Sequence, residues 1–372
     1  MRIDGLTLDF FRNYLHLEAR FDPSVNVIYG ENAQGKTNLL EAVAYLSGLT
    51  HRSRYDKELI QFGVDRAFLK GEVFSRDRTF LLEAKLQRGV RRQLYANGVR
   101  LKSAGELPGI FQCVLFCPED LYLIRAGAAE RRKFLDECIC QLRPRYAQAL
   151  QEYRRLHEHK TRILRDSEEK PSLLETLDEF SLGMAKAGAV VIHYRAHFLE
   201  KLRSAAAEIH RDFSGGREEL ALAYETVSTV RDPLGSVQEI FSQLLGHQER
   251  HRAAEIAAQV CLSGPHKDDF SVEINGVSAK TYSSQGQTRT AALSLKLAAR
   301  EIFRRDSGEY PVLLLDDVLS ELDQRRQEFV LNRIQGGQVF ITCCEDDRLG
   351  QLLQGKVFHV REGVLSAGPR RG

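Results

Sequence analysis

Long apolar runs are absent from the 372-residue sequence, in which no stretch approaches the roughly 18 apolar residues that a membrane-spanning helix needs. The first residues, MRIDGLTLDFF, alternate like a strand and lack the basic start and apolar core of a signal peptide. We therefore expect a protein that neither spans a membrane nor is secreted, and that works in the cytoplasm.

An excess of one charge is also missing. The 53 Lys and Arg residues nearly balance 51 Asp and Glu residues, which leaves a net charge of +2 and excludes a large acidic or basic tail. Any nucleic-acid binding must therefore depend on local clusters. One such cluster lies between residues 130 and 165, with ten basic and five acidic residues. It is interpreted either as a solvated helical face with ion pairs or as part of a groove for DNA phosphates.

Paired CxxC units, which would indicate a zinc site, do not occur among the seven cysteines. The odd number in a long chain indicates reduced thiols, and buried small apolar side chains are their favoured role. A metal or redox role for Cys138 with Cys140, or for Cys343 with Cys344, is the alternative.

Strand patterns dominate the first third of the chain. Residues 3–10 and 25–29 predict strands, and residues 35–49 predict a helix with one apolar face. Residues 66–117 are rich in strand-forming runs, and Asn97-Gly98 is typical of a hairpin turn.

Helical periodicity follows from residue 128 to residue 213, with breaks predicted at Pro144 and at the polar turn 167–172. Strand and helix patterns alternate over residues 260–366, which favours a parallel sheet. The chain is thus expected to combine a mixed α/β part with a helical part.

A glycine-rich loop, GENAQGKT, follows the strand 25–29 and precedes the predicted helix. It matches G-x-x-x-x-G-K-[ST], in which backbone N–H groups face phosphates, the lysine adds a charge, and the last hydroxyl binds Mg²⁺. A helix-capping glycine turn is the alternative. The predicted nucleotide-binding residues here are Gly30, Glu31, Asn32, Ala33, Gln34, Gly35, Lys36, Thr37 and Asn38.

Two carboxylates, Asp316 and Asp317, end the apolar run 312–315. In phosphoryl-transfer sites the first such carboxylate serves Mg²⁺ and the second orients water, whereas the alternative is a core strand that enters a polar loop. Ser320 and Asp323 follow, and their spacing is close to a capping box for the next helix.

The segment SSQGQTR at residues 283–289 opens a predicted helix, and alone it indicates only a helix cap. Taken in order, however, GENAQGKT, SSQGQTR, LLLDD and SELD resemble the Walker A, signature, Walker B and D-loop motifs of ATP-binding-cassette ATPases. The 245 residues between Thr37 and Ser283 exceed a transporter insert and fall short of SMC coiled coils.

Four further segments, FRNY at 11–14, FCPEDLYLI at 116–124, ERRKFLDE at 130–137 and SGPHKDDF at 263–270, make the whole chain similar to the bacterial RecF family of recombination and repair proteins. The resemblance implies an α/β fold like ABC-ATPase and SMC heads, with a mixed-sheet lobe I and a predominantly helical lobe II. Lobe I would comprise residues 1–127 and 260–372, with the signature segment near 260–300 at a contact with lobe II, and lobe II residues 128–259.

The same resemblance implies ATP and Mg²⁺ as cofactors and a weak, DNA-stimulated ATPase. It implies head-to-tail dimerisation with ATP, binding to double-stranded DNA and to single-strand/double-strand junctions, assistance to RecA loading with RecO and RecR, and no membrane partner. The implied catalytic residues are Lys36, Ser284, Asp316 and Asp317, the implied metal ligands are Thr37 and Asp316, and further nucleotide contacts would come from Arg12, Ser284, Gly286, Gln287 and Asp323.

The sequence departs from transporter ATPases at three places. Asp317 stands where glutamate is usual, Thr342-Cys343-Cys344 replaces a switch histidine, and Gln285 replaces the first signature glycine. Gln112 is a candidate Q-loop residue, and His266 is either structural or a contact to DNA or between lobes. The alternatives are a transporter ATPase subunit, another SMC-like DNA-maintenance ATPase, and a kinase or GTPase, although the Asn-Lys-x-Asp motif for guanine is absent.

Overall fold

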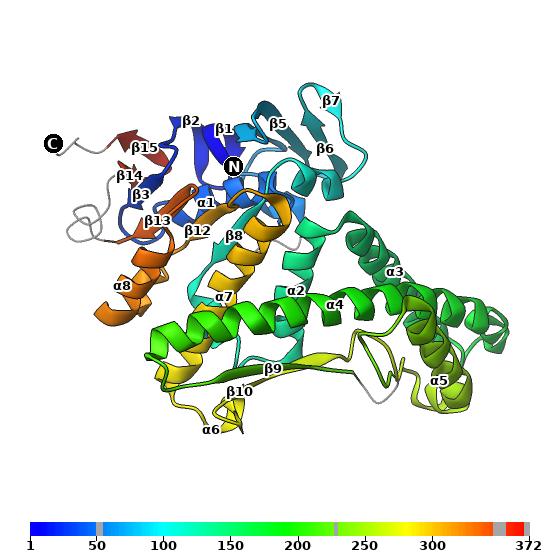
Figure 1. Cartoon of the computed structure of the whole chain (residues 1–372). Helices are drawn as coiled ribbons and strands as arrows, with labels where there is room; N and C mark the ends of the chain where they lie inside the picture. Colours follow the sequence, from blue (N-terminus) through cyan, green and yellow to red (C-terminus); the bar gives the residue numbers. More distant parts are fainter. Residues whose placement is uncertain (50–54, 227–229, 345–354, 368–372) are drawn as a thin grey trace. The chain divides into compact units, whose positions relative to one another are not determined.

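The computed structural model describes residues 1–49, 55–226, 230–344 and 355–367 (Figure 1). The chain divides into two compact units: unit 1 comprises residues 1–122 and 292–372, and unit 2 comprises residues 123–291. Within the described ranges, no helix is both long enough and apolar enough to cross a membrane.

Unit 1 contains an antiparallel sheet with the strand order β2-β1-β4-β5-β6-β7. Its strands are β1 (Arg2–Phe11), β2 (Tyr14–Arg20), β4 (Arg66–Ser75), β5 (Arg78–Gln87), β6 (Val90–Ala96) and β7 (Val99–Arg100). Asn97 and Gly98 join β6 to β7 with φ values of 51° and 77°, which confirms the predicted hairpin turn.

The second sheet of unit 1 is mostly parallel and has the order β15-β14-β3-β13-β12-β8. Its strands are β3 (Val25–Tyr29), β8 (Cys113–Phe116), β12 (Val312–Leu315), β13 (Val339–Cys343), β14 (Lys356–Arg361) and β15 (Val364–Ala367), of which only β15 pairs in the antiparallel sense. The strand before the glycine-rich loop, β3, lies between β13 and β14, so both of its neighbours come from the end of the chain.

Helix α1 (Lys36–Leu46) packs between the two sheets of unit 1 (Figure 1). Its side chains Leu39, Leu40 and Val43 join one core with residues of β1 and β4 on one side and of β3 and β13 on the other. The helix ends earlier than the predicted residue 49, because the cap at Ser47 is followed by Gly48 with φ of 86°.

Unit 2 is built around the 38-residue helix α4, against which α3, α5 and β9 pack (Figure 1). Its helices are α2 (Ala128–Leu142), α3 (Pro144–Asp166), α4 (Leu177–Ser214), α5 (Val237–Ala258), α6 (Ala279–Tyr282) and the start of α7 (Gln285–Ser307), and its strands are β9 (Leu220–Glu225), β10 (Asp269–Ile274) and β11 (Val277–Ser278). The break at Pro144, the first residue of α3, and the turn before α4 are confirmed.

Short 3-10 turns and one further helix complete the described chain. They are η1 (Asp56–Glu58), η2 (Ala104–Gly109), η3 (Pro118–Tyr122), η4 (Pro171–Thr176), η5 (Leu319–Glu321) and α8 (Gln324–Arg333).

The parallel sheet expected in the last third of the chain is confirmed for β12, β13 and β14, but not for its first strand. Residues 269–274 form β10, which pairs antiparallel with β9 and β11 rather than joining a parallel sheet. This pairing draws residues 260–291 into unit 2, so the compact units differ from the expected division at residues 127 and 259. Alternating patterns identify strands but do not say which distant strand is the partner.

Candidate functional site

The glycine-rich loop between β3 and α1 is shaped by two close backbone approaches. A Cβ atom at Gly30 would overlap the carbonyl oxygen of Val360, and one at Gly35, where φ is 121°, would lie 2.6 Å from Nδ2 of Asn13. Only glycine tolerates both the conformation at Gly35 and these distances. The loop conformation is thus set by the neighbouring backbone, and the N–H groups at the start of α1 remain available to an anion.

Lys36 places its charge inside this loop. Its ammonium group donates hydrogen bonds to the carbonyl oxygens of Gly30 (2.7 Å) and Glu31 (3.1 Å), and its side chain is almost fully buried. Cys344 approaches the same ammonium at 3.7 Å and also contacts Oδ1 of Asn32 at 3.1 Å. A buried cation held only by neutral groups favours an anionic ligand at this place.

The loop and the two-aspartate motif meet directly. Thr37 donates a hydrogen bond to Oδ1 of Asp316 at 2.9 Å, and Thr342 donates to the same oxygen at 3.0 Å. The hydroxyl oxygen of Thr342 also accepts the backbone N–H of Asp317 at 2.8 Å. Strand β13 thus supplies, through Thr342, one side chain that fixes both aspartates.

Two features of Asp317, its backbone conformation and an unpaired carboxylate oxygen, lower stability and therefore indicate a functional role. Its backbone φ of 51° lies in the left-handed region, which costs a non-glycine residue about 1–3 kcal/mol. Its buried Oδ1 atom has no hydrogen-bond partner among the described residues. An orphaned carboxylate oxygen next to Asp316 can accept a hydrogen bond from a water molecule or a ligand.

The turn between β1 and β2 contacts the loop through Asn13, which, with Arg12, is one of the two FRNY residues that the sequence offers for a contact near the nucleotide. Asn13 donates to the carbonyl of Gln34 at 2.8 Å and accepts a hydrogen bond from Asn38 at 2.8 Å. The predicted residue, Arg12, instead pairs with both carboxylate oxygens of Glu41 and donates to the carbonyl of Glu58.

The signature segment lies in unit 2 and caps α7. Ser284 donates its backbone N–H to the side chain of Gln287 at 2.9 Å, and its hydroxyl accepts the backbone N–H of Gln287 at 3.2 Å. The amide of Gln287 also donates to Glu218, whose other oxygen lies 3.0 Å from Nε2 of buried His210. Ser284 itself is exposed, and Gly286 follows it in the first turn, so this helix start faces solvent on a fixed support.

The cap of α8 differs from the prediction. Asp323 is the N-cap residue and accepts the backbone N–H of Arg326 at 3.0 Å, whereas Ser320 lies in the preceding turn and donates to the carbonyl of Asp317. The expected capping box beginning at Ser320 is therefore wrong, because an aspartate directly before the helix is itself a strong cap.

Two further sequence predictions also change. Gln112 lies at the start of β8, where its carbonyl accepts the N–H of Val312, and a four-residue strand of roughly 13 Å separates that end from Asp316. This placement does not support Gln112 as a Q-loop residue. Five cysteines are buried as expected and Cys140 is half-buried, but Cys344 is exposed beside Lys36.

The basic cluster at residues 130–165 is only partly a surface feature. Arg131 is buried against Asp269, and Lys160 is buried against Glu255 at 2.6 Å. Arg155 pairs with Glu152 on the surface, as the solvated-face interpretation expects. Counting charges along the chain therefore overestimates the positive surface.

Comparisons with known proteins match this architecture. Residues 2–364 fit the family described as the RecF/RecN/SMC N terminal domain. The DNA replication and repair protein RecF of Agathobacter rectalis is 40% identical over 98% of this chain and 99% of its own length. A solved structure of the recombination mediator protein RecF with ATP in the RecFOR pathway has a TM-score of 0.90 at 34% identity, covering 99% of this chain and 97% of that chain.

A more distant structure shares only the fold. The Smc head domain of Pyrococcus furiosus, bound to the C-terminal domain of ScpA, has a TM-score of 0.54 at 16% identity and covers 98% of this chain and 95% of that chain. The expected α/β architecture of ABC-ATPase and SMC heads is thus confirmed. The full-length identity and the matched family together establish that the chain belongs to the RecF family of DNA replication and repair proteins.

Proposed function

We propose that this chain is an ATP-dependent DNA-binding ATPase of recombinational repair and replication-gap processing, acting in the cytoplasm. The observation that carries the proposal is the direct hydrogen bond between Thr37 and Asp316, beside the loop that holds Lys36. It joins the two motifs that a Mg²⁺-nucleotide needs at one place. The relative solved as RecF-ATP supports ATP as the nucleotide.

In this proposal the loop residues bind phosphates. The N–H groups from Gly30 to Asn38 and the ammonium of Lys36 would hold the β- and γ-phosphates, and Thr37 with Asp316 would hold Mg²⁺. The oxygen chemistry of these two side chains fits a hard cation. The metal would neutralise developing charge on the phosphates, and the orphaned Oδ1 of Asp317 would orient the attacking water.

The signature segment would act on a second copy of the chain. Exposed Ser284, followed by Gly286 and Gln287 in the first turn of α7, forms a helix start that suits the γ-phosphate of an ATP bound to another subunit. Asp323, the cap of α8, would lie in the contact that closes the dimer. ATP would thereby hold two copies head to tail, and slow hydrolysis, stimulated by DNA, would release them.

DNA and the mediator proteins RecO and RecR are the proposed partners, since the relative of known structure is described as a mediator in the RecFOR pathway. The proposed DNA substrates are duplexes and single-strand/double-strand junctions, and the outcome would be assistance to RecA loading. Molecular mass in solution, measured by light scattering with ATP alone and with ATP plus a junction DNA, tests the proposal. A chain that stays monomeric and binds no DNA with ATP would contradict it.

Ser284→Arg is expected to preserve ATP binding and to abolish ATP-dependent dimerisation. The bulky cation would block the approach of the helix start to a phosphate, whereas Lys36 and its loop would be untouched. Sedimentation with ATP measures the dimer, and a fluorescent ATP analogue measures binding. Ser278→Arg, an exposed serine of the same unit, is the control. Dimerisation of the Ser284→Arg protein at the parental ATP concentration would exclude a contact between Ser284 and the ATP of the second copy.

Asp317→Asn is expected to retain ATP and to lower hydrolysis about 100-fold, because the amide no longer accepts a proton or orients water as the carboxylate does. The dimer should therefore accumulate. Asp316→Asn should instead weaken nucleotide binding in the presence of Mg²⁺, since the metal loses its carboxylate. Phosphate release and sedimentation distinguish the two, with exposed Asp65→Asn as the control. An unchanged rate in Asp317→Asn would remove this residue from the mechanism.

A further inference from the structure

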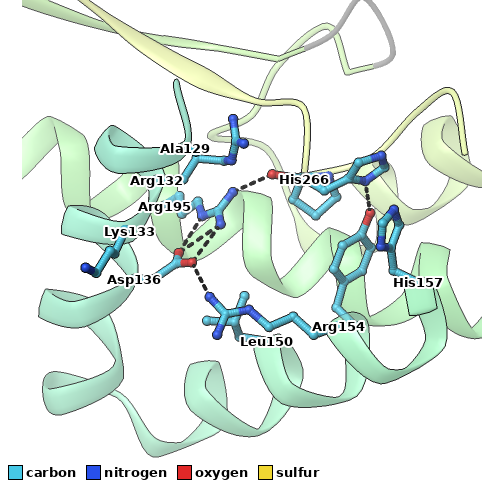
Figure 2. Close-up of a pocket in the computed structure, with 11 residues that line it drawn as sticks. Ala129, Arg132, Lys133, Asp136, Leu150, Arg154, His157, Arg195 and His266 are labelled. Atoms are coloured by element: carbon cyan, nitrogen blue, oxygen red, sulfur yellow. Dashed lines mark hydrogen bonds and ion pairs between the residues drawn. The ribbon is translucent and has the colours of Figure 1, made fainter. Parts of the chain in front are cut away.

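A cavity of about 190 Å³ opens on unit 2, and none of the residues assigned above to the nucleotide lines it. Helices α2, α3 and α4 and the segment that contains Pro265 and His266 form its walls (Figure 2). It is smaller than the roughly 300–1,000 Å³ of sites for drug-sized ligands. A single small chemical group fits it, whereas a whole nucleotide does not.

The charge of the lining is strongly positive. Arg132 and Lys133 from α2, Arg154 from α3 and Arg195 from α4 face one acidic side chain, Asp136. Asp136 is already engaged, because Arg195 binds it at 2.8 Å and Arg154 at 3.0 Å, as Figure 2 shows. Lys133 lies 3.9 Å from Glu137, which is outside the lining, so the positive charge available to a ligand rests on Arg132 and on the exposed Arg154.

Arg132 carries much of this charge. Its one hydrogen bond within the described chain goes from Nη1 to the carbonyl of Asp268 at 2.6 Å, and no described carboxylate lies within ion-pair distance of it. Burial and the nearby charge of Arg195 lower the pKa of Arg132, and the charges of Asp269, Asp268 and Asp136 oppose this shift only in part. Its Nε and Nη2 donors remain for a ligand.

The opposite wall supplies polar groups without adding charge. His266 lies 2.6 Å from the hydroxyl of Tyr153, and burial lowers its pKa to about 3, so it is neutral near pH 7. His157 packs against it with ring centroids 4.2 Å apart, and burial lowers its pKa as well. The residues of this wall that line the cavity, Tyr153, His157, Pro265 and His266, include no carboxylate that would repel an anion.

We propose that this pocket binds one phosphate group of a nucleic-acid strand, held by Arg132 and Arg154. The inference rests on the proposed DNA binding and adds a defined contact to it. Guanidinium groups match phosphate oxygens in a two-pronged geometry, and α2 and α3 each contribute one guanidinium group to the lining of this pocket. Arg154 is 64% exposed, so a strand that passes over the surface reaches the pocket from outside.

The test is the salt dependence of DNA binding by the full chain with ATP. One lost phosphate contact lowers the slope of log affinity against log salt by roughly 0.9 and weakens binding roughly tenfold near 0.1 M salt. Arg132→Gln and Arg154→Gln should each show a loss of this kind, and the double variant should lose roughly 0.9 in total, because one phosphate is involved. The neighbouring surface residue supplies the matched control, Arg155→Gln, which should keep the parental slope.

Several results would overturn the proposal. An unchanged slope in Arg132→Gln would do so, as would a loss of about 1.8 in the double variant, which indicates two separate contacts on an ordinary basic surface. Calorimetry with inorganic phosphate tests whether the ligand is a free anion. Phosphate binding that requires Arg132, together with an unchanged DNA slope, would reassign the pocket to a free anion. If Arg132→Gln loses binding to a peptide carboxylate and keeps the parental DNA slope, the pocket belongs to a protein partner.

Failure of the proposed function gives a different pattern. If the parental protein binds no DNA, the function itself is contradicted before any variant is compared. If the parental protein binds DNA and Arg132→Gln binds it equally well, only the pocket is contradicted. Binding of a fluorescent ATP analogue and an unchanged melting temperature verify that each variant is folded.

Discussion

Lys36→Met is expected to raise the dissociation constant for ATP at least about 100-fold. Methionine has nearly the same length, but it removes the charge that the loop encloses and the charge-assisted hydrogen bonds that this ammonium can give to phosphates. Two such bonds of roughly 1.5 kcal/mol each correspond to about 3 kcal/mol, or a factor of about 100. Calorimetric titration with ATP and Mg²⁺ measures the loss directly.

The matched control is Lys102→Met, which removes an exposed lysine from the same unit. It should leave ATP affinity unchanged. The Lys36→Met protein should retain its fold, because among the described contacts it loses the hydrogen bonds to two loop carbonyls and a long contact with the sulfur of Cys344. Parental ATP affinity in the Lys36→Met protein would mean that the loop serves as a structural turn, not as a phosphate site.

A second large effect is expected at the buried ion pair of unit 2. The ammonium of Lys160 lies 2.6 Å from Glu255, and the two side chains are 1% and 2% exposed. Lys160→Met leaves Glu255 as a buried carboxylate whose other oxygen only accepts the backbone N–H of Leu262. Breaking one partner of such a pair costs about 3–5 kcal/mol, which chemical denaturation of the full chain would detect.

The double variant Lys160→Met with Glu255→Leu provides the decisive comparison. Replacing both charges by apolar side chains removes the unpaired charge, so most of the lost stability should return. The exposed pair of Arg155 and Glu152 supplies the control, and Arg155→Met should cost less than about 1 kcal/mol. A loss below 1 kcal/mol in Lys160→Met would indicate that water reaches the pair.

The sequence was most informative where backbone geometry dictates residue type. The loop from Gly30 to Thr37 could be predicted because each of its glycines is required by a close backbone approach or a positive φ. The lysine and the threonine occupy fixed places relative to α1. The hairpin at Asn97-Gly98 and the break at Pro144 were predictable for the same reason. These signals are local and need no knowledge of distant contacts.

Contacts between distant segments were not predictable. Asn13 reaches the loop from a turn 21 residues earlier, and Thr342 joins Asp316 and Asp317 from another strand. The charge of Lys160 looked like a surface charge because its partner, Glu255, lies 95 residues away. In each case the side chain's role depends on strand order or helix packing, which a linear pattern does not specify.

The position of β3 between β13 and β14 has a consequence for biosynthesis. Both strands that pair with β3 lie within residues 339–361, so the ribosome must add more than three hundred residues after β3 before either ladder can form. At 5–20 residues per second this interval is roughly 15 to 65 s. Residues 25–29 emerge early as an apolar strand with two open edges, a template for wrong pairing. Because β13 and β14 flank β3 in this sheet, the phosphate loop reaches its final form only after residues 339–361 have been made, when the synthesis of unit 2 is already complete.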